Sequence, residues 1–405
     1  MTTIDRPASR ATADPISIDR PAEPATTDPA TIDPTTTEPA TTDPATAEPT
    51  TTDSATIDPG ELERFVGQVA TDCATAMHAA SVSLGDKLGL WAALAKGPAT
   101  STELAERSGL DARYLDDWLK AQYVSGYAGH DATTGRFSLS AEQAAVLADP
   151  TAPTYLAGAT TLAGVLHRDD ALAIEAFRTG QGVGWHEHHG DLFSGTERLF
   201  RPAYAANLVD AWIPALHGVE ARLQAGGKVA DVGCGFGAST ILLAQAFPAS
   251  TFVGFDYHDA SIEAARDRAA TAGVADRVTF EVATAGDFPG TGYDLVCIFD
   301  ALHDMGDPVG AVRHIKDSLA PTGTFMFVEP MAGETLDDNV NIVGQMFYSV
   351  APFVCTANAR SQHGPHELGN QVPDSMWDTL TREAGFSRFR RACETPFNRI
   401  YEVRP

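Results

Sequence analysis

Residues 229–237 read VADVGCGFG, an apolar run that holds the acid Asp231 and leads into Gly233, Gly235 and Gly237. Such a run predicts a buried strand followed by a tight turn. Glycines at alternate positions let the backbone come close to a ligand, because no Cβ is in the way. The stretch therefore predicts a cofactor-binding turn at the start of an α/β domain.

Asp231 bears on which cofactor fits that turn. A carboxylate two residues before the first glycine would repel the pyrophosphate of a dinucleotide and attract a cationic ligand. Ala238 nevertheless completes a loose GxGxxA pattern, so NAD stays an alternative on these residues alone.

With an acid followed by GxGxG, the chain resembles class I S-adenosylmethionine-dependent methyltransferases, whose first motif has this pattern. The resemblance implies that Asp231, Gly233, Gly235 and Gly237 bind S-adenosylmethionine.

Strand-like and helix-like segments alternate from Lys228 to Glu329, which predicts a parallel sheet with helices on both faces. The runs 389–394 and 399–403 flank a turn and predict an antiparallel hairpin. By resemblance, residues 224–405 form a Rossmann-like, seven-stranded methyltransferase domain that this hairpin closes.

The ends of the predicted strands suggest further cofactor residues, because ligands bind beyond the carboxyl ends of parallel strands. Asp256 ends the second strand, where a carboxylate can accept hydrogen bonds from both ribose hydroxyls. The resemblance adds Tyr257 beside it, Asp287 for the adenine amino group, Phe288 against the adenine ring and Phe299 near the methionine end.

Residues 298–308 read IFDALHDMGDP and resemble the LHDWDD stretch of small-molecule O-methyltransferases, with Met305 in place of the usual tryptophan. The resemblance makes His303 the general base, and an imidazole is free to accept a proton at neutral pH. Glu329, at the end of the fifth strand, would hold the imidazole as its carboxylate partner. Alternatively, His303 only fills a turn in which Asp304 or Asp307 caps the next helix.

Residues 61–150 predict two helices joined by a turn and followed by a hairpin, which is a winged-helix domain. The second helix carries three acids and two bases, so it lacks the surplus of positive charge that phosphate contact requires. The domain resembles the N-terminal domain of small-molecule methyltransferases. This implies that it forms a homodimer and does not bind nucleic acid.

Residues 151–223 predict a helical linker and substrate cap, interrupted by an ordered loop over residues 182–202. In that loop His186 and His188 are expected to contact substrate. The HxHH spacing differs from the i, i+4 spacing of zinc hydrolases, so no metal site is predicted.

Residues 1–60 repeat pentads such as ATTDP and predict a disordered tail, because proline blocks regular structure and little is apolar. The formal net charge of −26 disfavours nucleic acid and anionic membranes as partners. Five scattered cysteines favour a reducing cytoplasm, and neither a signal peptide nor a membrane span is predicted.

Together these features predict a cytoplasmic, homodimeric enzyme that moves a methyl group from S-adenosylmethionine to a small organic acceptor, with oxygen favoured and secondary metabolism as a setting. One alternative is a winged-helix transcriptional regulator that senses a ligand. The other is an enzyme of the same fold with non-methylating chemistry.

Overall fold

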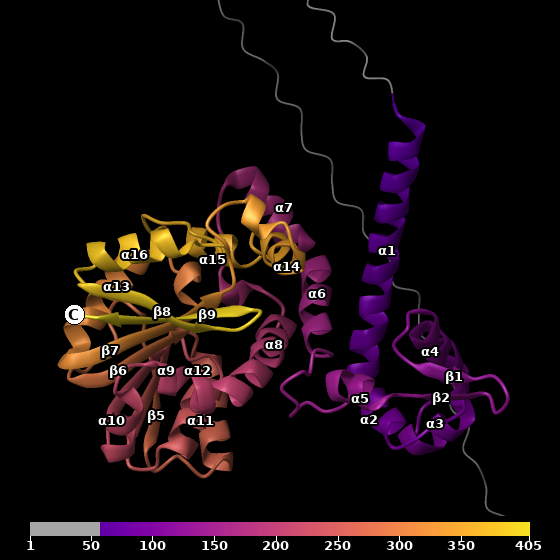
Figure 1. The fold of residues 1–405 in the computed structure, drawn as a ribbon, viewed down its shortest axis with the longest axis horizontal. Helices are drawn as coiled ribbons and strands as arrows, with labels where there is room; N and C mark the ends of the chain where they lie inside the picture. The colour runs from indigo at the N-terminus through magenta and orange to yellow at the C-terminus, as the bar shows by residue number, and fades with distance from the viewer. Residues whose placement is uncertain (1–56) are drawn as a thin grey trace, which may run out of the picture. The chain divides into compact units, whose positions relative to one another are not determined.

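A seven-stranded sheet with strand order β5–β4–β3–β6–β7–β9–β8 forms the centre of the C-terminal part of the chain (Figure 1). Neighbouring strands are parallel, except that β9 is antiparallel to β7 and β8. The strands are β3 (Lys228–Val232), β4 (Thr251–Asp256), β5 (Val278–Val282), β6 (Tyr293–Phe299), β7 (Leu319–Pro330), β8 (Arg388–Glu394) and β9 (Asn398–Arg404). The predicted fold class, including the closing hairpin, is confirmed.

The computed structural model describes residues 57–405. The tail predicted for residues 1–60 therefore lies, up to residue 56, outside the described residues. None of the helices within residues 57–405 has both the length and the hydrophobicity needed to cross a bilayer.

Helices cover both faces of the sheet and create two cores. On one face lie α10 (Val219–Ala225), α11 (Ala238–Ala246) and α12 (Asp259–Thr271), which pack through residues such as Leu243 and Ile262. On the other face lie α13 (Pro308–Ser318) and α16 (Asp374–Glu383), around the fully buried Trp377. Because the central strands are covered on both sides, they are apolar along nearly their whole length.

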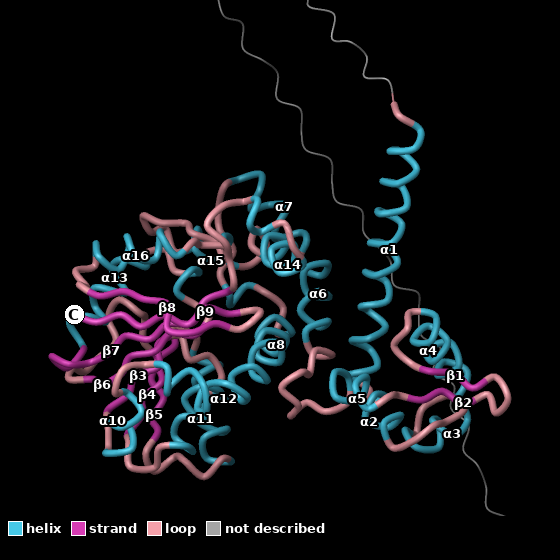
Figure 2. Tube along the Cα trace, viewed as in Figure 1, coloured by secondary structure: helices cyan, strands magenta, loops and turns pink. Residues whose placement is uncertain are grey.

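The N-terminal helices and a small hairpin form the predicted winged helix (Figure 2). Its elements are α1 (Pro59–Lys87), α2 (Leu90–Ala95), α3 (Ser101–Ser108), α4 (Ala112–Val124), β1 (Gly129–Asp131), β2 (Arg136–Ser138) and α5 (Ala141–Leu147). Helix α4 begins where Asp111 accepts hydrogen bonds from the backbone N–H groups of Arg113 and Tyr114. Trp91, Trp118 and Phe137 are buried in its core.

The middle of the chain is helical, and one expectation about it is wrong. Its helices are α6 (Ala159–Arg168), α7 (Asp170–Thr179), α8 (Asp191–Asn207) and α9 (Ile213–Ala215), and α14 (Ile342–Val350) and α15 (Cys355–Ser361) come from later in the chain. The loop predicted for residues 182–202 ends at α8, which begins at Asp191 and includes Pro202. Burial of the apolar side of α8, including Leu192 and Tyr204, outweighs the low helix propensity of its glycine and proline.

Buried ionic contacts connect α1 to α8. The Asp86 carboxylate lies 2.5 Å from Nη1 of Arg198 and accepts a hydrogen bond from Oη of Tyr155. Because the Asp86 side chain is only 8% exposed, losing Arg198 would leave a buried charge unpaired. This contact therefore attaches α1 of the winged helix to α8, a helix of the central helical region.

Gly237 offers a test of the packing at the glycine turn. Its φ is +76°, and a Cβ there would lie 2.6 Å from Cζ of Phe280. We expect Gly237→Ala to lower the free energy of unfolding by about 3 kcal/mol, through backbone strain and overpacking. Gly235→Ala is the control, because at φ +50° its Cβ would meet no atom within 4 Å; it should cost about 1 kcal/mol. Equal losses in urea denaturation would contradict the role given to Phe280.

Candidate active site

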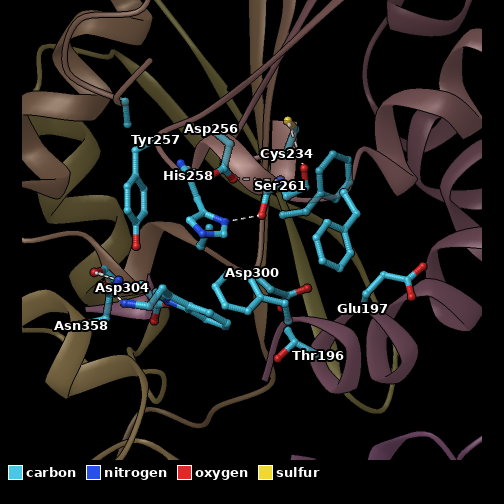
Figure 3. A pocket seen from close by; sticks show the side chains of 18 of the residues that line it. Thr196, Glu197, Cys234, Asp256, Tyr257, His258, Ser261, Asp300, Asp304 and Asn358 are labelled. Carbon is cyan, nitrogen blue, oxygen red and sulfur yellow. Dashed lines mark hydrogen bonds between the residues drawn. The ribbon is translucent and has the colours of Figure 1, made fainter. Parts of the chain in front are cut away.

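A cavity of about 470 Å³ lies at the carboxyl ends of the parallel strands, which is where open α/β sheets bind ligands (Figure 3). From the sheet side it is lined by the loops after four strands: Gly233–Phe236, Asp256–His258, Ala283–Ala285 and Phe299–Ala301. From the opposite side it is lined by the 184–186 loop, by α8 and by α15.

The glycine turn is open toward the cavity. Gly233 and Cys234 donate backbone hydrogen bonds to the Phe255 carbonyl, at 2.8 and 3.0 Å. Gly235 has a positive φ, and a Cβ there would point into free space. Gly233 and Gly235 thus line the cavity, whereas Gly237 lies behind the turn against Phe280.

Asp231 is placed beneath this turn and outside the cavity lining. Its Oδ2 accepts hydrogen bonds from the hydroxyls of Ser239 and Thr240, both at 2.6 Å. Burial raises the pKa of Asp231 to about 6, although these two donors work against the rise. Asp231 therefore holds the start of α11, and through it the cavity-lining Ser239.

Asp256 and Tyr257, two of the residues predicted to bind the cofactor, both line the cavity. Oδ2 of Asp256 accepts a hydrogen bond from the backbone N–H of Gly235 at 2.9 Å, and Oδ1 accepts one from His258 at 2.9 Å. Burial raises the pKa of this carboxyl above its ordinary value. Asp256 thus connects the end of β4 to the glycine turn.

Asp287 and Phe288 lie outside the cavity lining. The exposed Asp287 accepts hydrogen bonds from the side chain and backbone of Thr284, and these bonds lower its pKa. Phe288 is 1% exposed and stacks on Phe255 within the core, with ring centroids 5.1 Å apart. The segment that faces the cavity here is instead Ala283–Ala285.

The structure brings His303 and Glu329 together but keeps the imidazole out of the cavity lining. Nδ1 of His303 lies 2.6 Å from Oε2 of Glu329, and Nε2 lies 2.9 Å from Oδ1 of Asp304. Burial lowers the pKa of His303, but the charges of Glu329 and Asp304 outweigh it and raise the pKa well above its ordinary value. The ring is therefore an imidazolium between two carboxylates, and Asp304 faces the cavity in its place.

The histidine loop does not bring its histidines to one site. His186 lines the cavity, with its ring 6.5 Å from that of Tyr257. His188 is turned away, and its Nδ1 lies 2.9 Å from Oδ2 of Asp169. Of the two predicted substrate contacts, the structure thus places only His186 at the cavity.

The cavity holds more acids than bases. Among its described lining residues are Glu197, Asp256, Asp300 and Asp304, and the one lysine or arginine is Arg201, whose Nε lies 3.1 Å from Glu197. Enclosure in the cavity raises the pKa of Asp300 to about 8, because the carboxyl group loses hydration and Glu329 and Asp304 repel its charge, and Tyr204 and His303 offset this only in part. A cationic ligand would relieve this excess.

Residues 223–372 match a family model described as a methyltransferase domain, and residues 76–149 match one described as an Rv2258c-like winged HTH domain. This chain joins a winged-helix domain to a methyltransferase domain. The resemblance to methyltransferases with an N-terminal winged helix is thereby confirmed.

Curated relatives match about a third of the chain. The 27-O-demethylrifamycin SV methyltransferase of Amycolatopsis mediterranei is 34% identical over 131 residues, which are 30% of this chain and 48% of the relative. The methyltransferase GfsG of Streptomyces halstedii is 31% identical over 131 residues, which are 32% of this chain and 47% of the relative. The chain thus spans about half the length of these curated relatives.

Solved structures share the fold over most of the chain. Human N-acetylserotonin methyltransferase, in complex with S-adenosylmethionine, gives a TM-score of 0.64 at 16% identity and covers 86% of this chain and 99% of its own. The mitomycin 7-O-methyltransferase MmcR gives 0.63 at 22% identity, over 86% of this chain and 99% of its own. At these identities the likeness concerns the fold of the two domains together.

Sequence reasoning missed the contribution of α8 to the cavity of the methyltransferase domain. Phe193, Glu197, Phe200 and Tyr204 all line it from this helix. Their spacing of three or four residues is helical, so the signal was present within the segment that was expected to be a loop.

The turn that follows β6 is also hydrogen-bonded to the 184–186 loop and to the region of α15. Oδ2 of Asp304 accepts a hydrogen bond from Nε1 of Trp185 at 3.1 Å, and its backbone carbonyl accepts bonds from Asn358 and Gln362.

Within residues 57–405, the ligand atoms of His303, Asp304 and Cys355 lie within 4.8 Å of one another, a group that could hold a metal ion. The His303–Asp304 ion pair already accounts for two of these three side chains.

Proposed function

We propose that this protein is an S-adenosylmethionine-dependent methyltransferase that acts on oxygen in a small organic acceptor. The observation that carries the proposal is the acidic cavity beneath an open glycine turn. Buried carboxylates with raised pKa favour a cationic ligand and disfavour the pyrophosphate of NAD. When bound, S-adenosylmethionine supplies a methyl group on positively charged sulfur, which is already activated for transfer.

The predicted cofactor residues divide into two sets by their position. Those that line the cavity would contact the donor: Gly233, Gly235, Asp256, Tyr257 and Phe299. Those behind the lining would position them: Asp231, Gly237, Asp287 and Phe288. We assign the adenine end to Ala283–Ala285, whose small side chains face the cavity.

The acceptor would bind between the donor and α8. Phe193, Phe200 and Tyr204 of α8 line this side together with Trp185, and His186 is at its edge. Aromatic rings bury apolar area and suit a small, partly apolar molecule. The relatives named for rifamycin and mitomycin methylation support an acceptor from secondary metabolism.

The base role of His303 stays a prediction. Its pairing with Glu329 supports it. An imidazolium cannot accept a proton, however, so this role requires that the ring first lose its proton and reach past Asp304.

Binding of the donor tests the proposal. By isothermal titration calorimetry we expect S-adenosylmethionine and S-adenosylhomocysteine to bind and NAD not to bind. Asp256→Asn should weaken S-adenosylmethionine binding about 10-fold, because charge-assisted hydrogen bonds are lost. Asp287→Asn is the matched control, and its exposed position predicts a smaller loss. Binding of NAD alone would show that the proposal is wrong.

His303→Ala tests the base role. In transfer of a radiolabelled methyl group to a panel of phenols, kcat on the best acceptor should fall about 100-fold or more if His303 is the base. Because His303 is outside the cavity lining, the dissociation constant of S-adenosylmethionine should change little. Turnover near the wild-type rate would exclude His303 as the base.

We further propose that the protein is a homodimer formed through α1. Leu62, Phe65, Val66 and Val69 recur at helical spacing on this helix and are between 44% and 58% exposed. A continuous apolar stripe of this kind is typical of an association surface. A second copy presents the same stripe, so the two faces match by symmetry.

Sedimentation equilibrium tests the dimer. The wild-type chain should have twice its monomer mass of 42.8 kDa. Phe65→Glu combined with Val69→Glu should give monomers, because two charges enter the apolar stripe. Tyr114→Glu, at an 81% exposed position on α4, is the control and should stay dimeric. A monomeric wild-type chain would contradict this proposal.

Nucleic acid is not part of the proposed function, and the cytoplasm is the proposed location. On α4 the guanidinium of Arg113 lies 2.6 Å from Asp117, and the ammonium of Lys120 lies 2.6 Å from Asp116. Both bases of this helix are therefore neutralised by its own acids, which argues against the transcriptional-regulator alternative. All five cysteines are free thiols, as a reducing compartment would leave them.

A further inference from the structure

We propose that Asp300 is the proton-accepting residue of the cavity: it faces the cationic donor as a carboxylate and holds a proton once the donor has become a neutral thioether. This inference rests on the proposed function and names Asp300, in place of His303, as the group that receives the proton of the acceptor. It concerns a residue that lines the cavity, which His303 does not.

The backbone at Asp300 is held in an unusual conformation. Its φ is +49°, and His363 is the only other non-glycine residue within 57–405 with a positive φ. Its backbone N–H donates to the Val328 carbonyl at 2.8 Å, so the strained residue is anchored at the end of β6. Strain of this kind persists where the surroundings impose it and is concentrated at functional sites. Here the strained residue lines the cavity (Figure 3).

Two neutral donors from distant elements orient the carboxyl group. Oδ2 accepts a hydrogen bond from Oη of Tyr204 on α8 at 2.5 Å, and Oδ1 accepts one from Nδ2 of Asn398 on β9 at 2.8 Å. Neither donor carries a charge. They fix the position of the carboxyl and favour its ionised form, but neither of them neutralises its charge.

The groups near Asp300 have opposing effects on its pKa, so the charge of a bound ligand would strongly influence its ionisation. Glu329 and Asp304 repel a negative charge on Asp300, whereas the imidazolium of His303 and the hydroxyl of Tyr204 favour it. Enclosure is the largest influence, and the pKa of Asp300 rises to about 8. A sulfonium in the cavity would lower this pKa, and its conversion to a thioether would restore it.

The other acids of the cavity are already engaged. Asp304 is next to the imidazolium of His303 and bonded to Trp185. Asp256 accepts two backbone N–H bonds, and Glu197 lies 3.1 Å from Arg201. Asp300 differs from these three acids because both of its hydrogen bonds come from neutral side chains.

The proton balance follows from these roles. In the transfer step the acceptor oxygen gains the methyl carbon, the S–C bond breaks with its electron pair staying on sulfur, and the O–H proton goes to the Asp300 carboxylate. A sulfonium and a carboxylate become a thioether and a carboxylic acid, so the charge of the cavity is unchanged. Keeping the charge constant matters because a change in net charge is costly in a poorly hydrated site.

A displacement titration tests this without knowledge of the acceptor. The full-length protein, saturated with S-adenosylmethionine, is titrated with S-adenosylhomocysteine at pH 7.5 in weak buffer with a pH-indicator dye. The α-amino groups of the two ligands titrate at about pH 8 and add a background to the measured proton count, which the comparison of variants below removes. We expect the wild-type protein to take up protons, to a limit of one per site, because burial raises the pKa of Asp300 to about 8 in the cavity and a sulfonium beside it would lower this pKa.

Variants assign the proton to a residue. Asp300→Asn should abolish the uptake, whereas Asp317→Asn, the same substitution at an exposed acid of α13 outside the cavity lining, should preserve it. Tyr204→Phe removes a donor that lowers the pKa of Asp300, so the pH range of the uptake should move upward. This variant keeps the test valid if Asp300→Asn does not fold.

The outcomes separate the two proposals. Uptake that persists in Asp300→Asn, or that does not move in Tyr204→Phe, would place the proton elsewhere, on His303 or Asp304, and overturn the inference. Binding of both ligands without any uptake in the wild-type protein would also overturn it while leaving the proposed function intact. Failure of S-adenosylmethionine to bind at all would instead overturn the proposed function.

Discussion

The concentration of carboxylates at one end of the sheet is the constraint on which the rest of the structure depends. Asp256, Asp300 and Asp304 line the cavity, and Asp231 and Glu329 lie directly behind it. Burying acids costs free energy, and His303 compensates for it only beside Glu329 and Asp304, so the remaining acids favour a cationic ligand. The raised pKa of three of these carboxyls expresses this cost. A cationic methyl donor has the charge that the cluster lacks.

The same cluster joins the sheet to the helices that cover it. Tyr204 connects α8 to Asp300, Trp185 connects the 184–186 loop to Asp304, and Asn358 connects α15 to the backbone of Asp304. The cover of the cavity is therefore attached to the acidic groups themselves. In consequence, a change of charge at Asp300 or Asp304 can reach the acceptor side through direct hydrogen bonds, without a movement of the sheet.

Much of the fold could be predicted because the responsible signals are local. The apolar strands, the glycines of the turn and the hairpin around residues 395–398 each lie within about ten residues of sequence. α8 was predicted as a loop because Gly190, Gly195 and Pro202 lower helix propensity, whereas its apolar face becomes decisive only when other helices cover it. The place of Phe288 was missed for a similar reason, because its stacking on Phe255 depends on the loop after β5 folding back against β4.

By itself the sequence determined the class of fold, the cofactor turn and the acids that follow the strands, since periodicity and glycine placement act within single segments. Only the tertiary structure decided which of those acids face the ligand. His303 and Asp304 are adjacent in the chain, yet one is enclosed between two carboxylates and the other lines the cavity. Asp300 acquires its proton affinity from Tyr204, Glu329 and the surrounding enclosure. The pKa of a side chain depends on its burial and on its distance from other charges, and neither can be read from a single segment of sequence.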